Sequence, residues 1–254
     1  MIIRKSQQEI EQMARAGEVV AETLEVLREY VKPGVTTAGL DRIADEFIRS
    51  RGGIPTFKGY RGYPASICAS PNAMVVHGIP GPYALEEGDV LSVDVGVTLD
   101  GFVGDSAWTY AVGEISPEAE RLLEVCEASL YAGIEQARVG NRLSDISHAI
   151  QAVTEEAGFS VIRALVGHGV GRSMHEDPQI PNYGPPGRGP LLQEGMTLAI
   201  EPMITAGEPD VYVHADEWSI SSVDESLAAH FEHTVAVTKD GPRVLTVAKA
   251  ALLR

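Results

Sequence analysis

The chain has 254 residues, a length that suits a single α/β domain or two tightly fused units. Hydrophobic residues make up 44% of it and charged residues 22%, so a globular core is expected rather than disorder. A formal net charge of −16 argues against nucleic acid as a main partner, because phosphates would be repelled. An ordinary acidic surface explains most of this charge, and carboxylates gathered around cations would contribute some of it.

The sequence carries no sign of secretion or of a membrane span. Its two cysteines, Cys68 and Cys126, lie far apart and indicate no disulfide framework. No signal peptide is visible, and no apolar run reaches the roughly 18–20 residues that cross a bilayer. We therefore expect a cytoplasmic protein in a reducing environment.

The first half is predicted to begin with two helices. Residues 6–30 carry an apolar stripe of helical period, and Ser6 with Glu9 fits a capping box. A second helix is predicted over residues 37–50, and glycines end it. Residues 54–112 are rich in Gly, Pro, Val and Tyr in short alternating runs, which indicates strands and hairpins.

The same order recurs in the second half. Helices are predicted over residues 116–137 and 143–158, with strands and loops in the remainder. The glycines that flank the helices recur at one spacing in both halves, as Gly34 with Gly140 and Gly52 with Gly158. This recurrence indicates an internal duplication.

A second alignment brings two carboxylates to equivalent positions. LEEGDVLSVD at 85–94 is similar to LQEGMTLAIE at 192–201, which aligns Asp94 with Glu201 at the end of a strand. A duplicated α+β chain can fold around a pseudo-twofold axis. Both carboxylates would then lie beside that axis.

Five candidate metal ligands lie in strand-like segments or directly after them: Asp94, Asp105, His168, Glu201 and Glu232. Four carboxylates would cancel the four positive charges of two divalent cations. The set therefore suits a dinuclear site rich in oxygen ligands.

The first-half pair depends on a hairpin. Alternation places Asp94 on the opposite face from its valine neighbours, and the turn at 99–101 would bring Asp105 close to it. Taken alone, this segment is better explained as a solvent-facing hairpin with ordinary acidic residues.

The second-half ligands have stronger local signals. His168 and His175 share a glycine-rich loop, which favours function over packing. Glu201 ends an apolar strand, where a carboxylate is costly to bury unless it is paired or bound to metal. Alternation directs Glu232 and the adjacent His233 to opposite faces, so we exclude His233 from the metal site.

Taken in order, the segments HGIP, VDVGV…GDSA, GHGVGRSMHEDP, AIEPM and FEHTVAVT resemble those of the type I methionine aminopeptidases. The resemblance runs over nearly the whole chain and is to the short bacterial form. It implies an α+β pita-bread fold, in which two halves related by a pseudo-twofold curve around a dinuclear centre. We expect one catalytic metallopeptidase domain over residues 1–254, with pseudo-repeats of about 1–113 and 114–254.

The resemblance also implies a role for each ligand. Asp105 and Glu232 would bridge two ions, Asp94 would bind one of them in bidentate fashion, and His168 with Glu201 would complete the other. The ions would be two divalent metals, either Co, Mn, Fe, Ni or Zn. In the family mechanism they activate a water that attacks the first peptide bond.

Further roles follow from the matched motifs. Glu201 would be the general base, and His77 and His175 would contact the scissile amide and stabilise developing charge. A methionine-sized pocket would be formed by Tyr60, Tyr63, Cys68 and Trp218, with Phe57 and Met174 nearby. Core packing explains any one of these pocket residues equally well. Many bacterial relatives have Cys and Phe in place of Phe57 and Met174, which leaves the width of the pocket open.

The implied substrate is the N-terminal methionine of nascent polypeptides, removed when the second residue is small. The implied context is a monomer in transient association with the ribosome, with neither a nucleic acid substrate nor a membrane. Three alternatives were weighed. A pita-bread peptidase for Xaa-Pro bonds usually has a large N-terminal domain, for which the first helix leaves no room. A non-catalytic pita-bread binding protein would lose metal ligands, and a generic acidic metal-binding module remains as the third.

Overall fold

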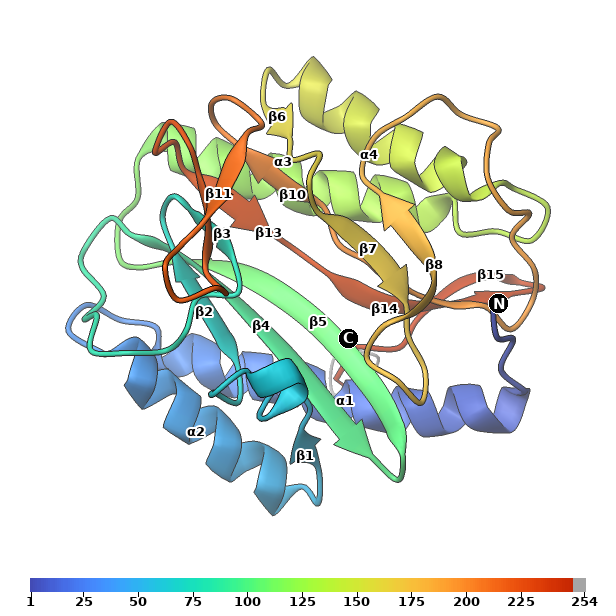
Figure 1. The fold of residues 1–254 in the computed structure, drawn as a ribbon, viewed down its shortest axis with the longest axis horizontal. Coiled ribbons are helices and arrows are strands. Elements are labelled where there is room, and N and C mark those ends of the chain that lie inside the picture. Colours follow the sequence, from blue (N-terminus) through green and yellow to red (C-terminus); the bar gives the residue numbers. More distant parts are fainter. Residues whose placement is uncertain (249–254) are drawn as a thin grey trace.

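The computed structural model of the chain describes residues 1–248. Four α-helices lie on the outside of curved strands (Figure 1): α1 (Gln7–Tyr30), α2 (Thr37–Ser50), α3 (Pro117–Glu135) and α4 (Leu143–Glu156). All four begin and end within two residues of the predicted bounds. No helix within residues 1–248 is both long and apolar enough to cross a membrane.

The helix starts follow their local sequence. The Ser6 hydroxyl accepts a hydrogen bond from the backbone N–H of Glu9 at 3.3 Å, and the Glu9 carboxylate accepts one from the backbone N–H of Ser6 at 2.9 Å. This is the predicted capping box of α1. Ser116 caps α3 in a similar way, and Pro117 occupies the first helical position, where no N–H is needed.

The first half contains a four-stranded antiparallel sheet with β4 at its centre: β1 (Ile54–Pro55), β2 (Cys68–Pro71), β4 (Val90–Leu99) and β5 (Phe102–Ala111). The predicted hairpin is formed by β4 and β5, in which Gly96 lies opposite Asp105 and Asp94 lies opposite Ala107. Asp94 and Asp105 therefore share a face of the sheet. A 3₁₀ turn at Tyr60–Gly62 lies between β1 and β2.

The second half contains a five-stranded sheet in the order β15-β14-β9-β7-β8: β7 (Val166–Gly169), β8 (Glu176–Pro181), β9 (Thr197–Ile200), β14 (His233–Thr238) and β15 (Gly241–Val244). Two small sheets complete the fold. One contains β6 (Ser160–Val161), β10 (Met203–Thr205) and β13 (Ala228–His230), and the other β3 (Met74–Val76), β11 (Val211–Val213) and β12 (Ile220–Ser222).

Backbone conformation repeats between the halves. The aligned glycines adopt nearly the same left-handed φ values: 86° and 96° at Gly34 and Gly140, 77° and 84° at Gly52 and Gly158, and 92° and 89° at Gly88 and Gly195. One apolar core packs α1 and α2 against β4, and a second packs α3 and α4 against β9 and β14. Each half thus has its own helix layer and its own core.

The two halves meet where β5 packs against β14. The Thr234 hydroxyl accepts from the backbone N–H of Asp105 at 3.1 Å and donates to the Asp105 carbonyl at 2.8 Å. The backbone N–H of Glu232 donates to the carbonyl of Ala107 at 2.9 Å. These bonds place one predicted ligand from each half at the junction.

Helix α1 lies unusually close to β5 at two glycines. A Cβ on Gly104 would lie 2.6 Å from the backbone N of Gly17, and a Cβ on Gly17 would lie 2.3 Å from the Leu245 carbonyl oxygen. Real side chains do not tolerate such distances. Glycine at position 104 therefore lets the helix backbone rest directly on the hairpin, and glycine at position 17 makes room for the segment that follows β15.

Candidate metal centre

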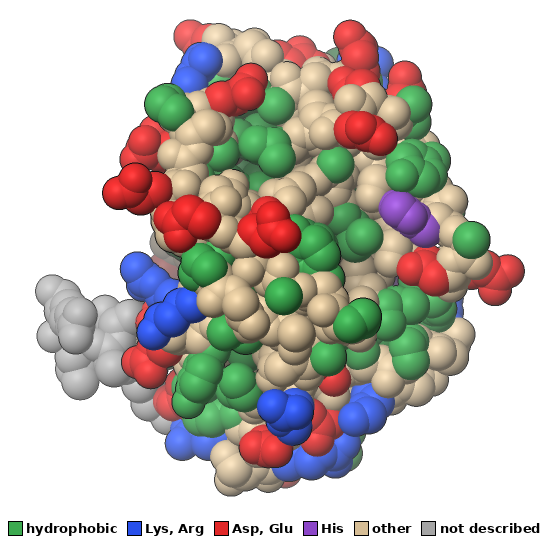
Figure 2. All heavy atoms as spheres, turned by 90° about the vertical axis from the view of Figure 1, so that its left-hand side faces the viewer, with side chains coloured by type: hydrophobic (Ala, Val, Ile, Leu, Met, Phe, Trp, Pro, Cys, Tyr) green, Lys and Arg blue, Asp and Glu red, His purple; other side chains and the backbone are tan. Residues whose placement is uncertain are grey.

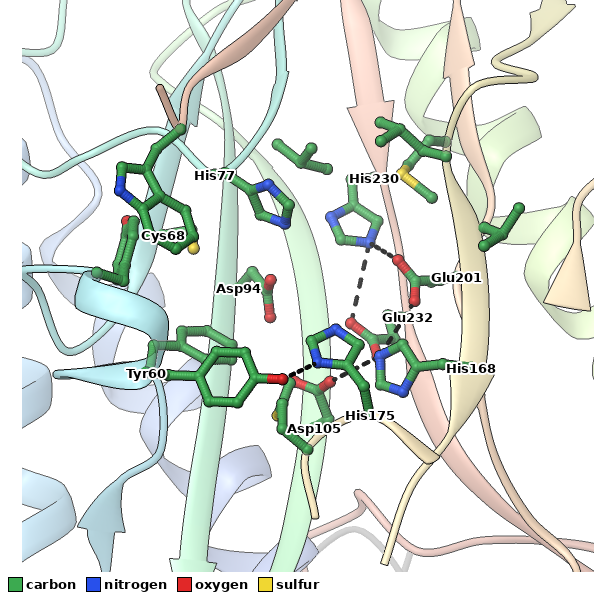
Figure 3. Close-up of a pocket in the computed structure, with 18 of the residues that line it drawn as sticks. Tyr60, Cys68, His77, Asp94, Asp105, His168, His175, Glu201, His230 and Glu232 are labelled. Atoms are coloured by element: carbon green, nitrogen blue, oxygen red, sulfur yellow. Dashed lines mark hydrogen bonds and ion pairs between the residues drawn. The ribbon is translucent and has the colours of Figure 1, made fainter. Parts of the chain in front are cut away.

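A cavity of about 220 Å³ opens between the halves, and we call it the metal cavity. Its walls include all five predicted metal ligands, both predicted catalytic histidines and all six predicted pocket residues (Figure 3). The walls also include residues that were not predicted from the sequence, among them His230. Segments far apart in the chain are thus brought to one place.

The first half contributes Asp94 and Asp105 from neighbouring strands. Asp105 is buried, with 2% of its surface exposed, and Asp94 lies across from Cys68 of β2. One oxygen of each carboxylate is buried without a hydrogen-bond partner among the described residues. Burial, followed by neighbouring carboxylates, raises the pKa of both groups well above the ordinary value.

The second half contributes His168, Glu201 and Glu232. Nδ1 of His168 is 2.9 Å from the carbonyl oxygen of Gly169 and donates to it, so the lone pair of Nε2 faces the cavity. That nitrogen lies 3.4 Å from Glu201 and 3.6 Å from Asp105. Burial is the largest cause that raises the pKa of Glu201 and Glu232 and lowers that of His168 to about 4.

These residues fit divalent cations. Ligand atoms of Asp105, His168 and Glu232 lie within 4.8 Å of one another, and Glu232 also has a buried oxygen without a partner among the described residues. Four carboxylates so close together repel one another when ionised, and bound cations would remove that repulsion. The donor set of one imidazole and several carboxylates suits Mn, Fe or Co.

His77 follows β3 in a left-handed backbone conformation, with φ of 59°. Such a φ is uncommon for a residue other than glycine and accompanies functional sites. It directs the imidazole toward the metal cavity (Figure 3). Burial, then the nearby histidines, lowers the pKa of His77 to about 4, so the side chain is neutral at pH 7.

His175 precedes β8 and is held by an aromatic neighbour. Its Nδ1 lies 2.9 Å from the Tyr60 hydroxyl, and the two rings stack with centroids 5.5 Å apart. Its ring also lies 4.3 Å from that of His168. Burial, followed by the charge of Arg61, lowers the pKa of His175.

The loop that carries His175 is fastened by a buried ion pair that the sequence did not suggest. Lys5 lies 2.5 Å from Glu176, and both side chains are less than 10% exposed. The other Glu176 oxygen accepts from the backbone N–H of Arg172 at 2.9 Å. The N-terminal segment therefore helps to position a predicted catalytic residue.

The predicted methionine pocket forms one wall of the metal cavity. Phe57, Tyr63, Cys68 and Met174 are buried, and Tyr63 meets Trp218 edge to face at 5.1 Å. Burial, followed by the charge of Asp94, raises the pKa of the Cys68 thiol well above its ordinary value. The thiol is therefore protonated at neutral pH.

The structure places His233 away from the cavity. Its Nδ1 lies 2.8 Å from the Thr246 hydroxyl, on the face opposite Glu232. The same alternation rule also puts His230 on the face of Glu232, since the two are separated by one residue. His230 is thus a cavity residue with a metal-ligating side chain that was not predicted from the sequence.

Comparison with known proteins identifies the class. Residues 11–239 match the model of Metallopeptidase family M24. The solved methionine aminopeptidase of Rickettsia prowazekii superposes with a TM-score of 0.96 at 43% identity, and covers 97% of this chain and 100% of that one. The prolidase of Pyrococcus horikoshii shares the fold, with a TM-score of 0.77 at 20% identity over 98% of this chain and 65% of that one.

The curated relatives are more similar in sequence. "Methionine aminopeptidase 1" of Bacillus subtilis is 54% identical over 97% of this chain and 99% of its own length. A methionine aminopeptidase of Clostridium acetobutylicum has the same identity, 54%, and the same coverage of both chains. The chain belongs to metallopeptidase family M24 and, within it, to the methionine aminopeptidases. The resemblance inferred from the motifs and the pita-bread fold that it implied are confirmed.

Proposed function

We propose that this chain is a metal-dependent aminopeptidase that removes the N-terminal methionine from polypeptides whose second residue is small. The observation that carries the proposal is the convergence of Asp94, Asp105, His168, Glu201 and Glu232, from both halves, on one cavity with an apolar wall. The relatives at 54% identity, named methionine aminopeptidases, support the same activity.

The five ligands would hold two divalent ions, with Asp105 and Glu232 at the junction of the halves shared between them. Bound ions would supply Lewis acidity and a water of lowered pKa at neutral pH. Unpartnered buried oxygens on Asp94, Asp105 and Glu232 support this assignment. The identity of the physiological metal is a matter of availability as well as of ligand type.

Three protein side chains would transfer the proton and bind the reacting amide. Glu201, at the cavity wall, would accept the proton of the attacking water. When the Tyr60 hydroxyl donates to Nδ1 of His175, Nε2 of that ring carries the proton and can donate to the carbonyl oxygen of the substrate. His77, also neutral, would interact with the scissile amide from its own side of the cavity.

The apolar wall would select methionine. Aromatic rings and sulfur atoms pack favourably around a thioether, and the wall offers Phe57, Tyr63, Trp218, Met174 and Cys68. The cavity volume of about 220 Å³ limits the side chain that can enter. The free α-amine of the substrate would bind at the carboxylate-rich end, which would confine cleavage to the first peptide bond.

A peptide assay tests the proposal. With Mn²⁺ or Co²⁺ added, we expect release of methionine from Met-Ala-Ser and none after chelation. The prolidase-like fold provides the second candidate, which a proline-containing dipeptide would detect. Cleavage of Xaa-Pro peptides without release of methionine would reject the proposal, and so would the absence of both activities in metal-loaded protein.

The cellular setting is part of the proposal. We propose a monomer that acts in the cytoplasm on nascent chains, in transient association with the ribosome. We also propose that residues 1–254 form one catalytic unit, with repeats of about 1–113 and 114–254. The matched φ values of the paired glycines support this division.

A further inference from the structure

His230 is a buried histidine whose ring ends in the metal cavity. It is the last residue of β13, and 2% of its surface is exposed. Its Nε2 has no hydrogen-bond partner among the described residues. Figure 3 shows the ring directed toward Glu201 and Glu232, beside His77. A buried polar atom without a hydrogen-bond partner is destabilising, so a ligand bound at this nitrogen would stabilise the structure.

The distances around this nitrogen suit a shared cation. Nε2 of His230 lies 3.6 Å from Oε2 of Glu201 and 3.9 Å from Oε2 of Glu232. Both separations are too long for hydrogen bonds. Two donor atoms that bind one ion at about 2.1 Å lie roughly 3.0–3.4 Å apart in octahedral or tetrahedral geometry. A shift of a few tenths of an ångström would bring Nε2 of His230 and either carboxylate oxygen to the spacing of two donors on one ion.

The candidate ligands form two groups of three. Asp105, His168 and Glu232 make one group, and Glu201, His230 and Glu232 make the other. Glu232 belongs to both. The two oxygens of Glu201 face different imidazoles, Oε1 toward His168 and Oε2 toward His230. Each group therefore contains one imidazole.

The backbone holds His230 firmly in place. The Thr109 hydroxyl accepts from the backbone N–H of His230 at 3.0 Å and donates to its carbonyl at 2.8 Å. The residue also pairs with Met203 of β10. Thr109 belongs to β5, so the first half fixes a residue of the second. Side chains on such rigid strands are well suited to bind metal.

We propose that Nε2 of His230 is a sixth metal ligand, which completes a cation position with Glu201 and Glu232. The inference deepens the proposed function, since it assumes that the cavity holds divalent ions. It brings the candidate ligands to two imidazoles for two ions. Imidazole suits Co, Ni, Fe and Zn better than Mn or Mg, so His230 would raise the preference of the site for those metals.

One competing explanation is that His230 donates a hydrogen bond to Glu201 and only orients it. His230→Gln separates the two, because an amide can still donate a hydrogen bond but is a poor ligand for these metals. His230→Ala removes both capacities. His233→Gln is the matched control, since it makes the same change at a buried histidine on the opposite face.

The experiment measures metal binding, with titration calorimetry for Co²⁺ and Mn²⁺ and the visible absorption of the Co²⁺ protein. For His230→Gln and His230→Ala we expect at least a tenfold loss of Co²⁺ affinity at one position, an altered Co²⁺ spectrum and a smaller loss for Mn²⁺. His233→Gln should bind like the unchanged protein. Unchanged Co²⁺ affinity and spectrum in His230→Gln would overturn the proposal.

A measurement on the unchanged protein tests the proposal even if the variants fail to fold. X-ray absorption of protein loaded with two Co²⁺ should show an average of one imidazole ligand per ion. If His230 is not a ligand, His168 alone gives an average of half an imidazole per ion. Release of methionine from Met-Ala-Ser is measured in parallel. A Co²⁺ protein with one imidazole per ion but no such release would reject the peptidase proposal and leave the ligand assignment standing.

Discussion

At the scale of single residues, the metal cavity combines groups whose protonation is set by burial. The carboxylates lie together and have raised pKa values, whereas His77 and His168 have pKa values lowered to about 4. The histidines are therefore neutral across the physiological range. A neutral imidazole can bind a metal or donate a hydrogen bond without adding charge.

Replacement of His77 tests its role in the reaction. We expect His77→Ala to lower kcat by about 10²-fold, because loss of one group that stabilises developing charge has an effect of that order. Its metal content should be unchanged. Because the pKa of His77 is about 4, its protonation should not reduce the activity until the pH falls toward that value. Full turnover by His77→Ala in a steady-state peptide assay would refute the assignment.

The sequence was informative about individual ligands for a specific reason. Alternation along a strand fixes the face of a side chain, and this rule separated Glu232 from His233. For Asp94 and Asp105 the rule needed the turn at 99–101 as well, and that segment alone favoured a solvent-facing hairpin. The left-handed backbone at His77 has no local signal of that kind, because histidine rarely adopts it. The motif, and not the residue pattern, directed attention to His77.

At the scale of elements, the start of the chain and the start of β8 depend on each other through Lys5 and Glu176. Removing one member of a buried ion pair leaves an uncompensated charge, which typically costs about 3–5 kcal/mol. We therefore expect Lys5→Ala to lower stability by that order, measured by urea denaturation, and to impair turnover through the loop of His175.

Two variants check this expectation. Arg4→Ala removes a neighbouring basic residue whose hydrogen bonds are exposed, and should have a much smaller effect. The double variant Lys5→Ala/Glu176→Ala should be more stable than Lys5→Ala alone, since it removes the unpaired carboxylate. If the double variant instead loses the sum of the losses of Lys5→Ala and Glu176→Ala alone, the ion pair does not couple these elements.

The contact of α1 with β5 gives a second prediction. We expect Gly104→Ala to destabilise the protein by about 1–3 kcal/mol, because the added methyl group overlaps the backbone at Gly17. Gly81→Ala is the control, since its nearest neighbouring atom lies 3.8 Å from the added Cβ. Thermal denaturation measures the melting temperatures of Gly104→Ala and Gly81→Ala. Equal melting temperatures would contradict the close contact between α1 and β5.

Helix positions were predicted to within two residues because caps and glycines mark both ends. Strand partners were not predicted across the halves. The contact of β5 with β14 joins residues more than a hundred positions apart, and no local pattern specifies it. Strands such as β1 and β6 have only two residues, too few for a period to be recognised.

At the scale of the whole molecule, ligands from both halves make the folded state sensitive to metal and to pH. The pKa values of Asp94, Asp105, Glu201 and Glu232 are raised in the metal-free fold. Such groups stabilise the fold below their unfolded pKa values, near 4, and this contribution is lost as the pH rises through the folded values. The cavity histidines, with lowered pKa values, act in the opposite direction below their ordinary pKa of 6.5. The metal-free protein should therefore be more stable at pH 6.5 than at pH 8.

Bound metal should oppose this trend, because cations favour the ionised carboxylates. At a free Mn²⁺ concentration about 100 times the Kd, binding adds roughly 2.7 kcal/mol. We expect melting temperatures measured from pH 6.5 to pH 8 to fall in chelator and to fall less or to rise in Mn²⁺. In chelator, the melting temperature of the variant Asp105→Asn/Glu232→Gln should fall less with pH than that of the unchanged protein, because two cavity carboxylates are gone. An equal fall in both proteins would mean that the trend comes from the acidic surface.

The surface itself carries acidic side chains beside apolar ones (Figure 2). The net charge of −16 includes the four carboxylates of the cavity, which two divalent ions would neutralise. The remaining acidic excess is a property of the exterior. It agrees with the initial interpretation that an acidic surface explains most of the charge.

The buried Cys68 thiol has a kinetic consequence. It lines the metal cavity, is 4% exposed and has a raised pKa, so an alkylating reagent must enter the cavity and finds a protonated thiol there. Its modification should therefore be slower than that of an exposed thiol. The rate of labelling at Cys68 would then report whether the pocket is occupied, because a bound methionine side chain would slow it.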